Sequence, residues 1–442
     1  MIPALRSPHD REILRLAVPA FGALAAEPLY ILVDTAIVGH LGTSPLAGLA
    51  IAGTVLTATF AIFNFLAYST TGAVARQVGA GNRRAAAELG VDSLWLATGL
   101  GLSLTVLGAV FAPAIVDVMG ASRAVHPFAV TYLRISVLGA PALLITLAGA
   151  GYLRGLQDTR TTLVIAVASN AANVVIEVLF VYGLDMGIAG SAWGTVIAQY
   201  GAALGYVAVV ARTVRAEHAS VRLQAAGIRA NARVGGRLVI RTGSLLAAFL
   251  AATAIASRIG DDDVAAHQIA FQVFLFLGLS LDAIAIAGQA MVGRFLGAED
   301  PAEARAAARR MIELGVAVGV VFAVVLVAVR PLLVPVFTND PGVRHLAMQV
   351  LLIVAALQPL NAVVFVLDGV LIGAGDVTYL AAAMLAATLL VFVPAAAAVL
   401  VFGGGLVWLW GALSLWMVAR CVGMATRFVG PRWQVTGAVR TA

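Results

Sequence analysis

The sequence contains no lysine: all 28 basic residues are arginine, and charged residues make up only 11% of the 442 positions. A soluble domain has about 25% charged residues, so this chain has too little charge to cover a water-exposed surface. The single cysteine, Cys421, excludes a disulfide framework and a cysteine-based metal site. Walker A, HExxH and GxSxG motifs are also missing, which argues against an ATP-driven motor and against two common classes of hydrolase.

Long apolar runs take the place of the missing charge, and 61% of the residues are hydrophobic. A helix of about 20 apolar residues crosses the hydrocarbon layer of a membrane and satisfies its own backbone groups. The apolar runs do not alternate as β-barrel strands do. The sequence therefore predicts an all-α membrane protein with twelve transmembrane helices, at 12–38, 46–72, 88–118, 128–150, 161–183, 187–211, 236–258, 264–292, 308–338, 346–372, 378–402 and 405–428.

The arginines gather in alternate loops between these spans, on the side that also holds both termini. The long connection of 212–236 alone carries Arg212, Arg215, Arg222, Arg229 and Arg233. Such a bias marks the cytoplasmic side, so we expect a multi-pass protein of the cytoplasmic membrane with both termini inside the cell. The positive charge then reflects topology, and no nucleic-acid partner is expected. The polar stretch 1–10 does not resemble a cleavable signal peptide.

The two halves of the chain repeat each other with a constant shift of 218 residues and no gaps. The aligned landmarks are residues 35–37 with 253–255, Arg76 with Arg294, Pro113 with Pro331, Pro141 with Pro359, Gly151 with Gly369, Gly155 with Gly373, and Asp158 with Asp376. Six spans per half is an even number, which predicts parallel repeats related by an axis along the membrane normal, as in transporters. The predicted organisation is an N-lobe of 1–211, a cytoplasmic linker of 212–236 and a C-lobe of 237–442.

Some polar residues of the first half have lost their counterpart in the second. Asp34, Asn170, Asn173 and Glu177 align with Ala252, Thr388, Val391 and Ala395. A carboxylate within the hydrocarbon layer is costly and normally marks an ion path, although a buried, hydrogen-bonded packing role is the alternative. The two asparagines are equally compatible with contacts between helices.

Helical spacing places these groups on two faces. Glu27, Tyr30 and Asp34 share one face of the first span, and Asn170, Asn173 and Glu177 share one face of the fifth. Pro28 would loosen the first span and is a candidate hinge. If the two faces meet, their oxygens suit a proton or a hard cation such as Na⁺ better than a transition metal.

The second half has polar exceptions of its own. Asp282 aligns with Asn64 and has Gln289 on its face, and Asp368 aligns with Ala150. These four polar residues are candidates for substrate contact, with local helix packing as the alternative.

Four segments carry a resemblance to a known family: 33–39 (VDTAIVG), 76–82 (RQVGAGN), 281–289 (LDAIAIAGQ) and 367–376 (LDGVLIGAGD). On these segments the chain resembles the multidrug and toxic compound extrusion (MATE) transporters, most closely their DinF-like branch. The resemblance implies two six-helix lobes that export drugs or metabolites against an inward flow of H⁺ or Na⁺. It implies no enzymatic activity and no cofactor apart from that coupling ion.

The resemblance also implies a cation site in the N-lobe. The family's aspartate of the first span matches Asp34, its asparagine and acid of the fifth match Asn173 and Glu177, and its threonine of the sixth matches Thr195. Many relatives have aspartate where this chain has Glu177, and the family's acid of the seventh span has no match here. We expect proton coupling, the usual expectation for the DinF-like branch, with Na⁺ at these four residues as the alternative.

The sequence thus predicts a cation-coupled antiporter, monomeric in the lipid bilayer, that exports amphipathic or cationic small molecules by alternating access. Two other functions stay open. A flippase for lipid-linked precursors of the same superfamily would have a more basic cavity, and a non-transporting membrane scaffold would not need carboxylates in one half only.

Overall fold

The computed structural model describes residues 7–440, and all regular elements within this range are helical. The fifteen α-helices are α1 (Pro8–Gly39), α2 (Thr43–Ile62), α3 (Phe65–Gly79), α4 (Arg83–Val118), α5 (His126–Ser136), α6 (Ala140–Gly155), α7 (Thr159–Val178), α8 (Ile188–Ala216), α9 (Ala225–Ile259), α10 (Asp261–Gly297), α11 (Pro301–Phe337), α12 (Pro341–Gly373), α13 (Val377–Ala387), α14 (Val393–Val401) and α15 (Leu406–Val429).

Twelve segments of the described chain are long and apolar enough to cross a membrane, which confirms the predicted number of spans. Three spans are built from two helices each. The second is interrupted between α2 and α3 at Phe63 and Asn64, the fourth by a 3-10 turn at Val137–Gly139, and the eleventh by a π-helical turn at Thr388–Phe392. A π-helical turn at Leu179–Gly183 also ends the fifth span. Hydrophobicity alone predicts the length of a span but not these breaks.

The polar connection between the halves is shorter than its composition suggests. The sequence predicts a linker of 212–236, whereas α8 continues to Ala216 and α9 begins at Ala225. Only 217–224 lie outside a helix. Alanine and arginine are both good helix formers, so the basic stretch continues the helices beyond the apolar spans.

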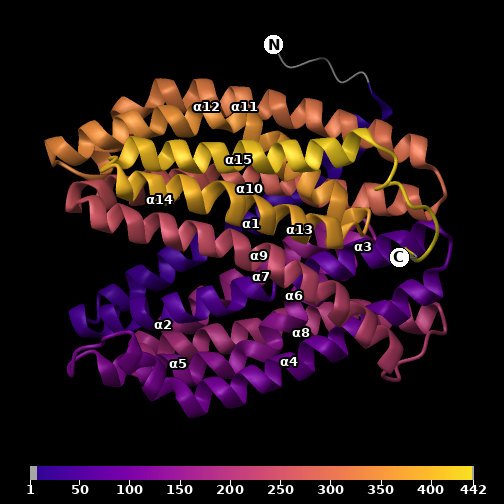
Figure 1. The fold of residues 1–442 in the computed structure, drawn as a ribbon. Coiled ribbons are helices and arrows are strands. Elements are labelled where there is room, and N and C mark those ends of the chain that lie inside the picture. The colour runs from indigo at the N-terminus through magenta and orange to yellow at the C-terminus, as the bar shows by residue number, and fades with distance from the viewer. Residues whose placement is uncertain (1–6, 441–442) are drawn as a thin grey trace. The chain divides into compact units, whose positions relative to one another are not determined.

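The chain divides into two compact units: unit 2 comprises Val18–Gly235, and unit 1 comprises Met1–Ala17 with Gly236–Ala442. The first turns of α1 therefore pack with the second half of the chain, although the sequence assigns them to the first lobe. Two ion pairs explain this placement, because Asp10 pairs with Arg310 and Glu12 pairs with Arg294. Within each unit the long helices run alongside one another (Figure 1).

The same close backbone contacts recur in both units at positions 218 residues apart. A Cβ on Gly101 would collide with the backbone of Pro141, and one on Gly319 would collide with that of Pro359. Likewise, Gly151 packs on the backbone of Ala67, and Gly369 packs on that of Ala285. The repeat seen in the sequence is thus a repeat of helix packing, with glycine at these closest backbone approaches.

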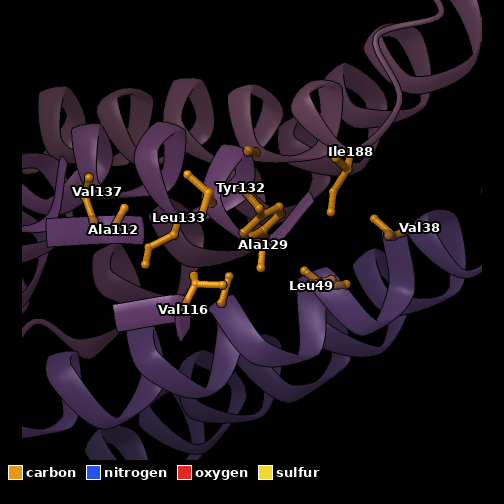
Figure 2. Close-up of a cluster of buried hydrophobic side chains, with 12 residues drawn as sticks. Val38, Leu49, Ala112, Val116, Ala129, Tyr132, Leu133, Val137 and Ile188 are labelled. Carbon is orange, nitrogen blue, oxygen red and sulfur yellow. The ribbon is translucent and has the colours of Figure 1, made fainter. Parts of the chain in front are cut away.

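A buried apolar cluster packs α1, α2, α4, α5 and α8 of unit 2 against one another (Figure 2). Helix α1 contributes Val38, α2 contributes Leu49, α4 contributes Val116 and α5 contributes Leu133. Tyr132 lies in the same cluster, so its ring is held by apolar neighbours. This packing fixes the direction in which the Tyr132 hydroxyl points, toward α1.

Candidate functional site

Asp34 is the centre of a polar group within unit 2. Its side chain is buried on α1, and it accepts hydrogen bonds from two other helices. Ser191 on α8 donates to Oδ1 at 2.5 Å, and Tyr132 on α5 donates to Oδ2 at 3.4 Å. Donors to a carboxylate stabilise its charged form, so Asp34 is a hydrogen-bonded acid and not an isolated one.

Glu177 on α7 is fully buried beside this aspartate. Its carboxyl group lies next to Asp34 and Ser191. Neither carboxyl oxygen makes a well-formed hydrogen bond to any described residue. The approach depends on Gly194 of α8, because a Cβ there would lie 3.1 Å from Cα of Glu177. Two carboxyl groups so placed repel each other when both are ionised, and a shared proton or a bound cation relieves that repulsion.

Thr195 links the other predicted residues, one helical turn beyond Ser191. Its hydroxyl forms a hydrogen bond of 2.7 Å with the Tyr30 hydroxyl of α1. It also accepts one of 3.3 Å from the side-chain amide of Asn173 on α7. Asn173 is buried, and its Oδ1 has no partner among the described residues. That oxygen, with those of Glu177, is an unused acceptor at the site.

Asn170 contacts the backbone of α1 instead of the acids. Its side-chain amide donates to the carbonyl of Ala26 at 3.0 Å, two residues before Pro28. Proline lacks the backbone N–H that continues a helix, so α1 is locally weakened where Asn170 binds it. Glu27, on the same stretch of helix, has an exposed side chain.

The structure therefore brings Tyr30, Asp34, Asn173, Glu177 and Thr195 together in one place, where α1, α7 and α8 meet. It does not bring Asn64 there. Asn64 lies half-buried at the break between α2 and α3 and makes no side-chain cap. Sequence reasoning missed Ser191 and Tyr132, because serine and tyrosine occur throughout membrane helices and spacing alone does not show which of them faces α1.

The predicted polar residues of the second half have different surroundings. Asp368 on α12 is bound by both arms of the Arg241 guanidinium from α9, with Nε 3.2 Å from Oδ1. Gln289 is buried with an unpartnered Oε1, and Asp282 is half-buried. Asp368 is thus committed to an ion pair inside unit 1, which makes direct contact with a substrate cation unfavourable.

The donor set of the unit 2 site suits a light cation. It offers carboxylate, amide and hydroxyl oxygens. The described residues of the site include no thiolate and no imidazole, which are the usual ligands of zinc and copper. Within residues 7–440, no group of three or more histidine, cysteine or acidic side chains is arranged to hold a metal. The arrangement can hold a proton between two carboxyl groups or a small ion among the oxygens.

Known proteins resemble this chain over nearly all its length. It is 32% identical to "Protein DETOXIFICATION 44, chloroplastic" of Arabidopsis thaliana over 433 residues, which cover 94% of the chain and 81% of that protein. It is 30% identical to "DNA damage-inducible protein F" of Escherichia coli K12 over 380 residues, covering 85% of the chain and 83% of that protein.

A solved structure described as "MATE in the bent conformation" has the same fold, with a TM-score of 0.87 at 21% identity, covering 98% of this chain and 96% of that one. The family model MatE matches residues 19–179 and 244–397, one segment in each half of the chain. These matches confirm the resemblance to MATE proteins and to DinF. The chain therefore belongs to the MATE family, and it is a multi-pass membrane transporter and not an enzyme.

Proposed function

We propose that this transporter is a cation-coupled antiporter of the cytoplasmic membrane, with H⁺ as the coupling ion and Asp34 and Glu177 as the groups that bind it. One observation carries the proposal: two buried carboxyl groups lie side by side in unit 2, and neither oxygen of Glu177 makes a well-formed hydrogen bond to a described residue. A proton on this pair removes the repulsion between them.

Three features favour H⁺ over Na⁺. Na⁺ needs several oxygen ligands at once, whereas the Thr195 hydroxyl is already shared by Tyr30 and Asn173. Each oxygen of Asp34 already accepts one hydrogen bond, from Ser191 or from Tyr132. Glu177 is also one methylene longer than the aspartate found in many relatives. A proton requires none of these groups to rearrange.

The proposed cycle follows from differential affinity. A proton arriving from outside is shared by the acid pair and removes one of its two negative charges. Helix α1 then bends at Pro28, where Asn170 already contacts the backbone carbonyl of Ala26. Substrate from the cytoplasm favours the deprotonated, straight form. Each ligand shifts the equilibrium only by its preference for one state, so the two ligands must prefer opposite states. Both termini lie in the cytoplasm, the protein acts as a monomer, and its substrates are amphipathic or cationic small molecules.

The test uses the full chain in proteoliposomes, with ethidium as an amphipathic cationic probe. A pH gradient should drive ethidium transport without Na⁺, and Asp34→Asn should abolish this transport. Asp117→Asn is the matched control, because Asp117 is an exposed acid on α4 and should leave transport unchanged.

Two outcomes would overturn the proposal. Transport by Asp34→Asn at the wild-type rate would reduce Asp34 to a packing residue. Transport that responds to a Na⁺ gradient and not to a pH gradient would assign the same site to Na⁺.

A further inference from the structure

The joining segment, residues 217–224 between α8 and α9, is fastened by its backbone to α4 of the same unit. Glu88 of α4 accepts a hydrogen bond from the backbone N–H of Ser220 at 3.3 Å. One turn further along α4, Asp92 accepts one from the backbone N–H of Gln224 at 3.1 Å. Two charged acceptors thus hold the main chain of the joining segment along α4, so it does not behave as a free linker.

Trp95 indicates the depth at which this segment lies in the membrane. It follows Asp92 on the same face of α4, its side chain is half-exposed, and its indole N–H donates to the carbonyl of Val221 at 3.2 Å. Positions 93–116 of α4 contain no charged residue, which is enough to cross the hydrocarbon layer. Tryptophan is enriched where that layer meets the headgroups. The joining segment therefore lies at the level of the lipid headgroups.

The contacts with α4 leave apolar side chains of the joining segment uncovered. Val221 is 64% exposed and Leu223 is 55% exposed. Arg222 stands between them and is exposed as well. A cationic group flanked by aliphatic side chains is typical of elements that lie in the membrane interface, where the charge meets the headgroups and the apolar groups enter below them.

Exposed arginines border the joining segment and have no acidic partner. Between positions 212 and 233 the only acid is Glu217. Glu88 of α4 pairs with Arg84 of its own helix, and Asp92 binds main chain. Within residues 7–440, no ion pair is made by the exposed arginines of this stretch, which are Arg212, Arg215, Arg222, Arg229 and Arg233. The surface therefore keeps an excess of positive charge.

The first turns of α9 extend this surface beyond the joining segment. Asn231 is buried, and its side-chain amide donates to the Ser93 hydroxyl of α4 at 3.2 Å. Arg229 and Arg233 lie one turn apart on α9, on either side of Asn231 in sequence, and both are exposed. The contact through Asn231 thus places α9 along α4 while its arginines stay uncovered.

We propose that the joining segment and the first turns of α9 form a binding surface for anionic lipid headgroups. Arg222, Arg229 and Arg233 bind the lipid phosphates, and Val221 and Leu223 enter the apolar layer below them. A guanidinium presents a planar fork of N–H donors that matches the oxygens of a phosphate. A basic residue close to an anionic membrane surface strengthens binding about fivefold.

This surface is separate from the acid pair of Asp34 and Glu177 and requires no coupling ion, so it goes beyond the proposed antiport. Arginines that only set the topology of the chain would need neither the exposed Val221 and Leu223 nor a backbone fastened at headgroup level. The surface can be tested in a membrane whose two leaflets are alike. The result then depends neither on the orientation of the chain nor on its transport activity.

The test measures which lipids approach Leu223 of the full chain in nanodiscs. Leu223→Cys, combined with Cys421→Ala to remove the native thiol, is labelled with the fluorophore nitrobenzoxadiazole. Phosphatidylglycerol and phosphatidylcholine, each with a nitroxide on the acyl chain, are compared as quenchers at the same mole fraction in a phosphatidylcholine membrane. Phosphatidylglycerol should quench at least threefold more strongly, because the arginines enrich it around the label.

Charge variants of the labelled chain show which arginines cause this preference. Arg222→Gln together with Arg229→Gln should bring the ratio of the two quenching strengths close to one. Arg123→Gln together with Arg160→Gln is the matched control, because it removes the same charge from two exposed arginines elsewhere in unit 2. The control should keep the preference for phosphatidylglycerol.

Four results would overturn the proposal. Equal quenching by the two lipids in the labelled chain would leave the arginines a role in topology only, and this comparison needs no charge variant to fold. Quenching by aqueous iodide and by neither lipid would place the joining segment in water, where a soluble partner could reach it. A preference that survives in the Arg222 and Arg229 variant, or that falls equally in the control, would separate it from these arginines. Loss of the preference on adding inorganic phosphate at constant ionic strength would show a site for free phosphate.

Discussion

Ser191 donates a 2.5 Å hydrogen bond to Oδ1 of Asp34 and thereby ties α8 to the acid of α1. Ser191→Ala removes a donor to a charged group, which is worth about 1.5–3 kcal/mol. Because Asp34 is the proposed coupling group, a loss of that size should slow proton-driven transport by about tenfold or more. Transport rates of Ser191→Ala and wild type, measured with the same pH gradient, check this.

Ser169→Ala is the control, because Ser169 donates to the carbonyl of Ala198 on the same pair of helices. Its transport rate should match wild type. An undiminished rate in Ser191→Ala would show that this hydrogen bond does not support the proposed coupling site.

Gly194 sets the distance between α7 and α8 at Glu177. An added methyl would lie 3.1 Å from Cα of Glu177, and such overpacking costs about 1–3 kcal/mol. Alanine gains about 1 kcal/mol over glycine in helix propensity, so Gly194→Ala should still lose stability or break even. Gly201→Ala on the same helix meets nothing within 4 Å and should gain that amount. Thermal midpoints in detergent should therefore be lower for Gly194→Ala than for Gly201→Ala, and the reverse order would refute the close contact.

Asp376 should hold the segment 430–440 to the N-terminal end of α13. Its carboxylate pairs with Arg427 at 2.6 Å and Arg440 at 2.9 Å. Asp376→Asn removes the carboxylate charge that Arg427 and Arg440 share, so both arginines lose this ion pair. Trypsin should then cleave after Arg432 several-fold faster, as measured by mass spectrometry of the released peptide.

Asp158 is the repeat equivalent of Asp376 and supplies the control. It caps α7 by accepting from the backbone N–H of Thr161 at 2.9 Å. Asp158→Asn should leave cleavage after Arg432 unchanged. Equal acceleration in both variants would mean that general destabilisation, and not loss of the ion pairs, exposes the segment.

The buried pair of Arg241 and Asp368 should show strong coupling. Asp368→Asn leaves a buried guanidinium uncompensated, at a cost of about 3–5 kcal/mol. Arg241→Gln together with Asp368→Asn removes both charges and should recover much of that loss. Unfolding free energies of the two single variants and the double variant give the coupling energy. Additive losses would show that the two side chains do not stabilise each other.

Much of this fold could be predicted from the sequence because hydrophobic length determines membrane spans almost alone. The acids and amides of unit 2 could be predicted as well, since comparing the halves exposes residues present in only one of them. Their hydrogen-bond partners could not, because Ser191 and Tyr132 are unremarkable until α8 and α5 are seen to face Asp34.

The burial of two arginines could not be predicted either. Arg241 and Arg420 lie near span ends, where arginine normally reports topology. The structure buries both side chains, one against Asp368 and the other against Trp416. Spacing along one helix does not reveal such burial, because it depends on which neighbouring helix lies opposite.

The glycine contacts shared by the two units have an evolutionary consequence. Gly101 with Pro141 and Gly319 with Pro359 are the same contact made twice, as expected of a duplicated six-helix ancestor. Two identical subunits would have to carry every polar residue in both copies. Fusion into one chain removes that constraint, so the packing residues could stay the same while the polar residues of the two copies came to differ.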